Sequence, residues 1–183
     1  MKKSENNLAF SFSLLSAMII SDMKEKEERI LVIIKPDAIV RGLIGEVYKR
    51  FERKGFKVIG TKMIHLSDIL LDDHYAHHKD KPFFKGIKKF MQSSPVILIV
   101  LSGVNACSAA RLIAEQTSAA EADAGTIRGD FAMSIQSNIV HVSDSPENGE
   151  IEVKRFFSED EIFDYKRVDE AFVYSDVHED FSA

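Results

Sequence analysis

The sequence predicts an α+β fold in which a four-stranded sheet is covered by helices. Residues 30–34 form an apolar, β-branched run of strand length that ends at Pro36 and Asp37, which are typical turn residues. Residues 96–101 form the strongest predicted strand, because no polar side chain interrupts them, and we expect this strand at the centre of the sheet. Between these runs, apolar residues recur at helical spacing over residues 44–51.

The elements between the first helix and the central strand follow from local signals. Gly55 is expected to end the first helix as its C-cap. Residues 56–64 alternate apolar and polar side chains, which predicts a second strand with one solvated face. Ser67 is a typical helix N-cap, and Pro82 marks the start of a further helix with an apolar stripe.

The C-terminal half continues with an Ala-rich helix from residue 105 to about residue 116 and a long ordered loop over residues 117–129. A short apolar strand follows at residues 138–142, and helical pieces are expected at residues 145–154 and 159–165. This order of elements matches a ferredoxin-like split βαβ sandwich, with helices covering one face of a mixed sheet.

Length and charge set broad limits on function. A chain of 183 residues fits one compact domain with tails. The formal net charge is −5, from 24 basic and 29 acidic residues, so the chain as a whole has no electrostatic reason to bind nucleic acid or an anionic membrane. Cys107 is the only cysteine, which excludes an intramolecular disulfide and a Cys-based zinc cluster, and it fits a reducing compartment such as the cytoplasm.

The first 28 residues differ in pattern from the rest. Lys2 and Lys3 precede an apolar run at residues 8–20, as in a secretory signal, but serines interrupt the run and no cleavage pattern follows. We therefore expect residues 1–28 to be an N-terminal extension, either disordered or the product of a start codon upstream of the true one, with a signal peptide as the alternative. The domain is expected to span residues 29–183.

The segment with the clearest chemistry surrounds His141, which stands at the end of an apolar strand and just before a polar turn. A neutral imidazole is a good nucleophile near pH 7, and a carboxylate such as Glu152 can fix its tautomer. The residues alone leave open a simpler interpretation, in which a single histidine at a strand end only caps or packs.

The segment Asn138-Ile139-Val140-His141-Val142-Ser143-Asp144-Ser145 closely resembles the nucleoside diphosphate kinase signature Asn-x-x-His-Gly-Ser-Asp-Ser. Glu152 stands at the position of the family's glutamate. The likeness runs from Arg29 to Glu152 without insertion or deletion and includes Lys35-Pro36-Asp37, Arg41-Gly42-Leu43-Ile44-Gly45-Glu46, His74-Tyr75, Lys81-Pro82-Phe83-Phe84 and Gly125-Thr126-Ile127-Arg128-Gly129-Asp130-Phe131.

This resemblance implies a four-stranded antiparallel sheet and an enzyme that passes the terminal phosphate from a nucleoside triphosphate to a nucleoside diphosphate through a phosphohistidine. The implied catalytic residues are His141 as nucleophile, Lys35, Tyr75, Glu152 and Ser143. The implied nucleotide-binding residues are Lys35, Arg111, Thr117, Arg128 and Asn138 for the phosphates and the sugar, with Phe83, Ile87 and Ile135 for the base. Stacking on the base without specific hydrogen bonds would permit broad use of purines and pyrimidines.

The resemblance also implies Mg²⁺ that arrives with the nucleotide, with Asp144 as a candidate contact through water. It implies a homo-oligomer, either a hexamer or a tetramer, that binds ATP and other nucleotides and no membrane. The alternative function is a catalytically weak regulatory or nucleic-acid-binding member of the same family, and a purely structural oligomer is a third possibility.

Three features depart from the family pattern or compete with it. Val142 replaces a glycine, which would strain the backbone if that position needs a positive φ. Ala119 and Ala124 replace loop prolines, so we expect a looser loop. The cluster His74, His77 and His78 could suggest a metal site, but we expect a solvated helix face instead.

Overall fold

The computed structural model describes residues 27–115 and 117–174. The first strand, β1 (Glu27–Ile34), begins earlier than expected. It includes Glu27 and Glu28, which the sequence analysis assigned to the N-terminal extension. The rest of that extension, the signal-peptide alternative, the end of the helix expected near residue 116 and the C-terminal tail of the expected domain lie outside the described residues.

The described residues form a four-stranded sheet with the order β2-β3-β1-β4. Its other strands are β2 (Lys57–Ile64), β3 (Val96–Val104) and β4 (Val140–Val142). Every pairing is antiparallel, so the mixed sheet expected from the element order is wrong and the sheet implied by the resemblance is confirmed. The apolar strand β3 lies inside the sheet, as its unbroken run predicted.

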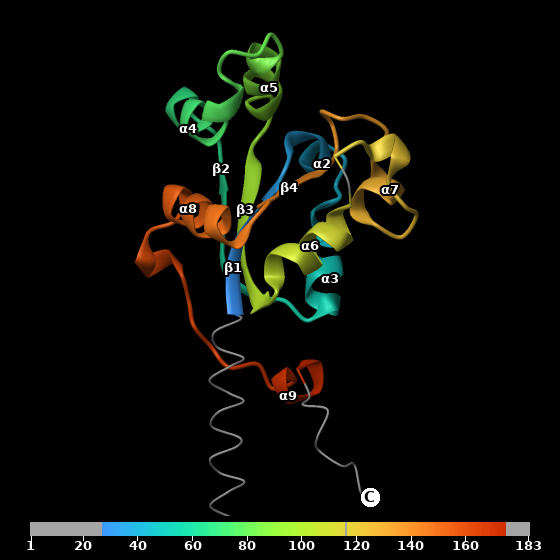
Figure 1. Cartoon of the computed structure of the whole chain (residues 1–183), viewed down its shortest axis with the longest axis vertical. Helices are drawn as coiled ribbons and strands as arrows, with labels where there is room; N and C mark the ends of the chain where they lie inside the picture. The colour runs from blue at the N-terminus through green and yellow to red at the C-terminus, as the bar shows by residue number, and fades with distance from the viewer. Residues whose placement is uncertain (1–26, 116, 175–183) are drawn as a thin grey trace, which may run out of the picture.

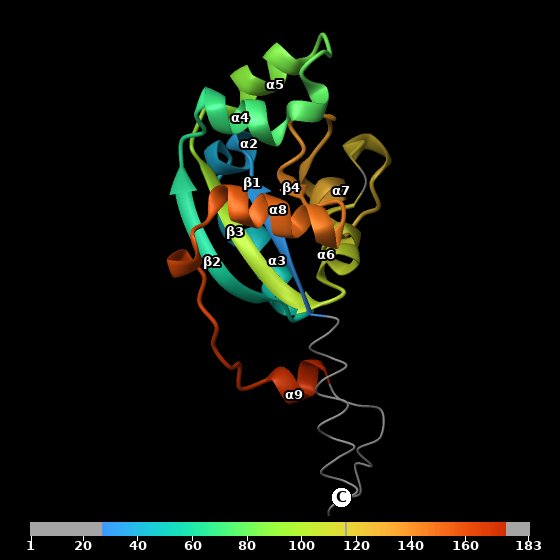
Figure 2. The ribbon, with the colours of Figure 1, turned by 60° about the vertical axis from the view of Figure 1, so that its left-hand side comes forward.

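Helices cover both faces of the sheet, which corrects the expectation of one covered face (Figure 1). On one face lie α3 (Ile44–Lys54) and α6 (Ala106–Ala114). On the other lie α4 (Asp68–His74), α5 (Phe84–Met91) and α8 (Pro146–Phe156), with α4 and α5 gathered at one end (Figure 2).

The sequence of β1 explains why both faces are covered. Ile30, Val32 and Ile34 belong to the core on the α3 face, while Leu31 and Ile33 belong to the core on the α8 face. Successive side chains of a strand point to opposite faces, so an apolar run without alternation needs cover on both sides. All five side chains are fully buried.

Short elements fill the connections: α2 (Pro36–Val40), η1 (Ala76–His78), η2 (Ala119–Glu121), α7 (Ile127–Phe131), η3 (Glu159–Glu161) and α9 (Glu170–Val173). The segment expected as a loop at residues 117–129 thus contains a helical turn and the start of α7. The helix expected at residues 159–165 is one turn only. None of the helices in the described ranges combines the length and apolar character that a membrane span requires.

The predicted helix starts at Ser67 and Ser145 and the predicted end at Gly55 are confirmed, whereas α5 begins at Phe84, two residues after the start predicted at Pro82. Ser67 accepts a hydrogen bond from the backbone of Leu70 at the start of α4, and Ser145 does the same with Asn148 at the start of α8. Gly55 ends α3 with φ 106°, a left-handed conformation that glycine adopts without steric cost.

Candidate active site

His141 lies in the middle of β4 and pairs with Ile33 of β1. Its neighbours Val140 and Val142 point into the core on the α3 face, so the strand directs the imidazole to the opposite face, toward α4 and α8. The His141 side chain is 23% exposed, which leaves it accessible while the strand holds it in place.

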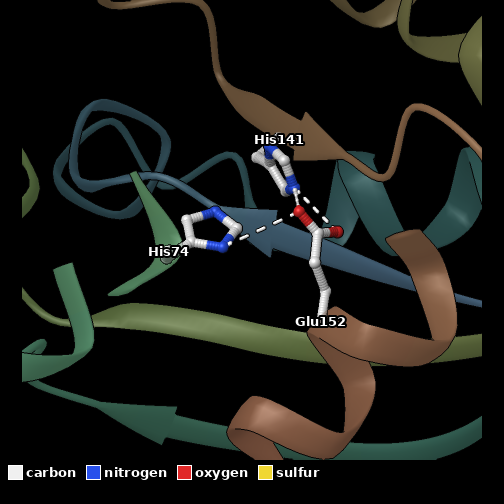
Figure 3. Close-up of side chains that lie close together, drawn as sticks. All are labelled: His74, His141 and Glu152. Atoms are coloured by element: carbon white, nitrogen blue, oxygen red, sulfur yellow. Dashed lines mark hydrogen bonds and ion pairs between the residues drawn. The ribbon is translucent and has the colours of Figure 1, made fainter. Parts of the chain in front are cut away.

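Glu152 of α8 fixes the orientation of this imidazole (Figure 3). Its two carboxylate oxygens lie 3.0 and 3.1 Å from Nε2 of His141. Burial alone would raise the pKa of the Glu152 carboxyl, but the hydrogen bonds from His141 and Ser143 outweigh it and the pKa is lowered. An ionised Glu152 can only accept, so we assign the proton to Nε2, which leaves Nδ1 with a free lone pair.

Ser143 ties Glu152 to the sheet. Its hydroxyl donates to Oε2 of Glu152 at 2.5 Å and accepts from the backbone N–H of Leu31 at 3.0 Å. The Ser143 N–H in turn donates to the Leu31 carbonyl at 3.1 Å. Ser143 is fully buried, so its hydrogen bonds hold the Glu152 carboxylate, whose side chain is 12% exposed, against β1.

Lys35 and Asn138 meet beside this strand. The Lys35 ammonium donates to Oδ1 of Asn138 at 2.5 Å, and the Asn138 amide donates to the carbonyl of Thr117 at 3.0 Å. Burial, and after it the nearby positive charge of Arg128, lowers the pKa of Lys35 to about 8, although the Asp37 carboxylate opposes the shift. The charged form of Lys35 is therefore disfavoured in the folded protein, and an anion bound beside it would stabilise that charge.

Arg128 of α7 is 8% exposed and donates to three backbone carbonyls: those of Val140 at 2.9 Å, Asn138 at 3.4 Å and Glu115. Burial, followed by the charge of Arg111, lowers its pKa to about 10. Arg111 itself is exposed on α6. Two guanidinium groups that repel each other favour an anion near both of them.

A strained residue leads into β4. Among the described non-glycine residues, positive φ occurs at Asn105, Glu115 and Ile139. Ile139, with φ 73°, is held by a bond from its N–H to the Asp37 carboxylate and by a bond from the Lys35 N–H to its carbonyl. The sequence did not reveal this role of Asp37 and Ile139, because β-branched residues ordinarily avoid positive φ.

Val142 is not among these positive-φ residues, so the valine that replaces the family's glycine causes no backbone strain here. It is 6% exposed and paired with Val32 across the sheet. The loop residue Ala119 is buried within η2 and Ala124 is exposed.

The remaining predicted residues differ in how deeply they are buried. Tyr75 follows α4 and is half-buried, and burial raises the pKa of its phenol. Phe83 is 52% exposed and Ile135 is 66% exposed, while Ile87 packs against the core on the α8 face. Thr117 is exposed, with its backbone carbonyl bonded to the Asn138 amide.

Asp144, the predicted metal contact, is exposed and accepts a hydrogen bond from the Asn148 side chain at 2.7 Å. Within the described residues, no hydrogen bond or ion pair joins Asp144 to the His141 imidazole.

His74 contradicts the expected solvated helix face. Its side chain is 2% exposed, whereas His77 is exposed. The His74 ring packs edge-on against His141 and Tyr75, with 4.7 Å between centroids in both pairs. Burial, and then the charge of His141, lowers its pKa to about 3, so His74 is neutral.

Comparison with known proteins agrees with this geometry. The family model described as "Nucleoside diphosphate kinase" matches residues 28–162. A nucleoside diphosphate kinase of Parabacteroides distasonis is 55% identical over 139 residues, which is 76% of this chain and 91% of the relative.

Two solved structures show the same likeness in three dimensions. A halophilic nucleoside diphosphate kinase of Halobacterium salinarum in complex with CDP matches with TM-score 0.79 and 41% identity, over 81% of this chain and 99% of that one. A transition state mimic of the nucleoside diphosphate kinase of Borrelia burgdorferi, with bound vanadate and ADP, matches with TM-score 0.76 and 33% identity. This match covers 81% of the present chain and 97% of the Borrelia chain. The antiparallel sheet and the position of His141 on β4 agree with these matches. The chain belongs to the nucleoside diphosphate kinase family.

Proposed function

We propose that this phosphotransferase carries the phosphoryl group on Nδ1 of His141, in a ping-pong reaction between a nucleoside triphosphate and a nucleoside diphosphate. The observation that supports this most directly is the bond from Nε2 of His141 to Glu152, because it leaves Nδ1 as the nucleophilic nitrogen.

In the first half-reaction, the Nδ1 lone pair attacks the terminal phosphorus and a bond forms between nitrogen and phosphorus. The bond from that phosphorus to the bridging oxygen breaks, and the nucleoside diphosphate leaves with the electron pair. The ring becomes positively charged in this step, and ionised Glu152 stabilises that charge through the Nε2 proton. The second half-reaction is the reverse, with a different diphosphate as acceptor.

Phosphate oxygens would be bound by Lys35, Arg111 and Arg128. Lys35 has a lowered pKa, and Arg111 and Arg128 repel each other, so each cation gains stability when a polyphosphate arrives. Thr117 and Tyr75 would add hydroxyl contacts. Asn138, which Lys35 and the Thr117 carbonyl hold in place, would bind the sugar hydroxyl together with Lys35.

The base would stack on Phe83, the exposed ring at the entrance to α5, with Ile87 and Ile135 beside it. Stacking reads the flat face of a base rather than its edge, so we infer that purines and pyrimidines are both accepted.

The residues present fit a magnesium ion that arrives with the nucleotide. Mg²⁺ prefers oxygen ligands and keeps most of its waters, and the exposed carboxylate of Asp144 can contact such a hydrated ion through water. When bound, the ion would neutralise charge on the phosphate oxygens. We infer further a homo-oligomer, either a hexamer or a tetramer, that acts in the cytoplasm, with the family domain over residues 29–183.

The test is phosphoenzyme formation from ATP with a labelled terminal phosphate. The wild type should yield an acid-labile, alkali-stable phosphoprotein and should pass the label to GDP. His141→Ala should yield neither, whereas His77→Ala, at an exposed histidine outside the site, should behave as wild type. A wild type that never labels, together with salt-sensitive DNA binding, would favour the regulatory alternative instead.

A further inference from the structure

His74 is a buried polar group without a hydrogen bond. Within the described residues, neither of its ring nitrogens has a hydrogen-bond partner, although its side chain is only 2% exposed. Buried polar groups are almost always paired with protein, water or an ion, so an orphaned imidazole calls for a physical explanation. Its Nδ1 lies 3.7 Å from Oε1 of Glu152, too far for a hydrogen bond but near enough to share a ligand with it.

Three potential metal ligands converge at this point (Figure 3). One ligand atom each from His74, His141 and Glu152 lies within 4.8 Å of the other two, with 3.0 Å between Nε2 of His141 and the carboxylate. Ligand atoms in a tetrahedral zinc site stand about 3.4 Å apart, as follows from metal-ligand distances of about 2.1 Å. The 3.0 and 3.7 Å separations fall on either side of that spacing.

The ligand chemistry selects the cation. Two imidazoles and one carboxylate suit Zn²⁺, whereas Mg²⁺ and Ca²⁺ prefer sets made entirely of oxygen. The ligands stand on three different elements, α4, β4 and α8, which the two-faced packing of the sheet fixes relative to one another. The His141 side chain is 23% exposed, so a metal ion can reach the three ligands from solvent on that side. His74, at 2% exposed, is the buried ligand.

We propose that His74, His141 and Glu152 form a zinc site that switches the nucleophile off. The carboxylate supplies one negative charge and each imidazole one lone pair, with a water molecule as the fourth ligand.

Zinc at Nε2 would change the tautomer of His141. The Nε2 lone pair that binds the metal is available only after the proton on Nε2 has left, and in the neutral ring that proton then sits on Nδ1, carried there by solvent. No electron transfer is involved, and the hydrogen bond from Nε2 to Glu152 is replaced by the metal bridge. Nδ1 now bears a hydrogen and has no lone pair for phosphorus. This inhibition rests on the proposed function, whereas zinc binding itself does not.

Binding is tested first on the full chain without nucleotide. Calorimetric titration with ZnSO₄ should show one site per chain, and Co²⁺ in its place should give the intense visible absorption of a tetrahedral complex. His74→Phe removes one ligand and keeps an aromatic ring against His141. Loss of a residue that only supports a metal ligand already weakens metal binding about 10- to 100-fold, so loss of a ligand itself should weaken zinc binding by at least that factor. His77→Phe is the matched control and should bind as wild type, because His77 is exposed.

His74→Gln serves as a second ligand-deletion variant if His74→Phe does not fold, as judged by thermal unfolding. The proposal is overturned if the wild type binds no zinc, if neither His74 variant weakens binding, or if His77→Phe weakens it equally.

Phosphoenzyme formation from labelled ATP then tests inhibition. For each protein, the amount of label bound in the presence of zinc is divided by the amount bound in its absence. Zinc should suppress labelling in wild type and in His77→Phe, and His74→Phe should still label at zinc concentrations that silence wild type. Labelling that persists in wild type with zinc bound would overturn the switch. A wild type that never labels, yet binds zinc through His74, would refute the proposed function and leave the metal site standing.

Discussion

The carboxylate of Asp37 accepts a hydrogen bond of 3.1 Å from the backbone N–H of Ile139, two residues before His141. Ile139 has φ 73°, a conformation that costs a β-branched residue about 1–3 kcal/mol. The Lys35 N–H binds the Ile139 carbonyl at 2.9 Å from the other side. The turn after β1 therefore holds the strained entry to β4 and so determines where the imidazole stands.

Asp37→Ala should remove this support. We expect a loss of about 1–3 kcal/mol in the free energy of unfolding, because the buried N–H of Ile139 loses its acceptor. The rate of phosphoenzyme formation should fall about 10-fold, the effect of about 1.4 kcal/mol, as β4 relaxes. Urea unfolding and rapid-quench labelling measure the two effects. Asp37→Asn keeps an acceptor oxygen and should show less than half of each loss; equal losses in both variants would contradict the hydrogen-bond explanation.

Ser143→Ala tests the link between the sheet and Glu152. The substitution leaves the Leu31 N–H without its side-chain acceptor and removes one of the donors to Glu152. We expect the free energy of unfolding to fall by about 1–3 kcal/mol and phosphoenzyme formation to slow, with little change in nucleotide affinity, because Ser143 is fully buried. Stopped-flow kinetics separates these quantities. A change in KM alone, with the labelling rate intact, would place Ser143 outside the support of the histidine.

The strands and the histidine segment could be predicted from the sequence because their signals are local. The run at residues 96–101 has no polar interruption, and His141 follows an apolar run and precedes a polar turn. Ile139 could not be predicted, since its conformation opposes its own propensity and depends on Asp37, which is 102 positions away.

His74 shows a second limit of sequence reasoning. The cluster His74, His77 and His78 has helical spacing, which predicts one shared face. In the structure α4 ends at His74 and a 3-10 turn follows, so His74 points into the core while His77 faces solvent. Which histidine is buried depends on α8 packing over the sheet, and that contact is long-range.

The lowered pKa of Lys35 predicts a pH dependence of activity. With a pKa of about 8 in the folded protein, Lys35 loses its charge in the free enzyme as pH rises through 8. We expect kcat/KM for the nucleotide to fall above about pH 8 with a slope of one proton. Lys35→Arg keeps its charge throughout this range and should give a profile that stays flat from pH 8 to 9.5, even if its plateau is lower. A wild-type profile that is also flat there would contradict the prediction.

The lowered pKa of Lys35 also affects the free energy of unfolding, which should rise with pH in the range where kcat/KM falls. Below about pH 8, Lys35 carries its proton in both the folded and the unfolded chain, and burial of the charge disfavours folding. Between about pH 8 and 10.5 the unfolded chain binds more protons, so the contribution of Lys35 to the free energy of unfolding rises with pH. Urea unfolding at pH 7.5 and 9.5, with Lys35→Met as the reference that cannot titrate, should show wild type gaining stability relative to the variant at the higher pH.

Val142→Gly restores the family's glycine beside the nucleophile and should nevertheless weaken the protein. Val142 has no positive φ, so glycine gains no backbone advantage and pays an entropic cost of about 0.5–1 kcal/mol in the strand. The valine side chain is 6% exposed, and its loss removes about 1.5–3 kcal/mol of burial. The free energy of unfolding should fall by about 2–4 kcal/mol. Val142→Ala isolates the packing part and should lie between glycine and wild type in urea unfolding. A glycine variant as stable as wild type would show that β4 does not depend on this side chain.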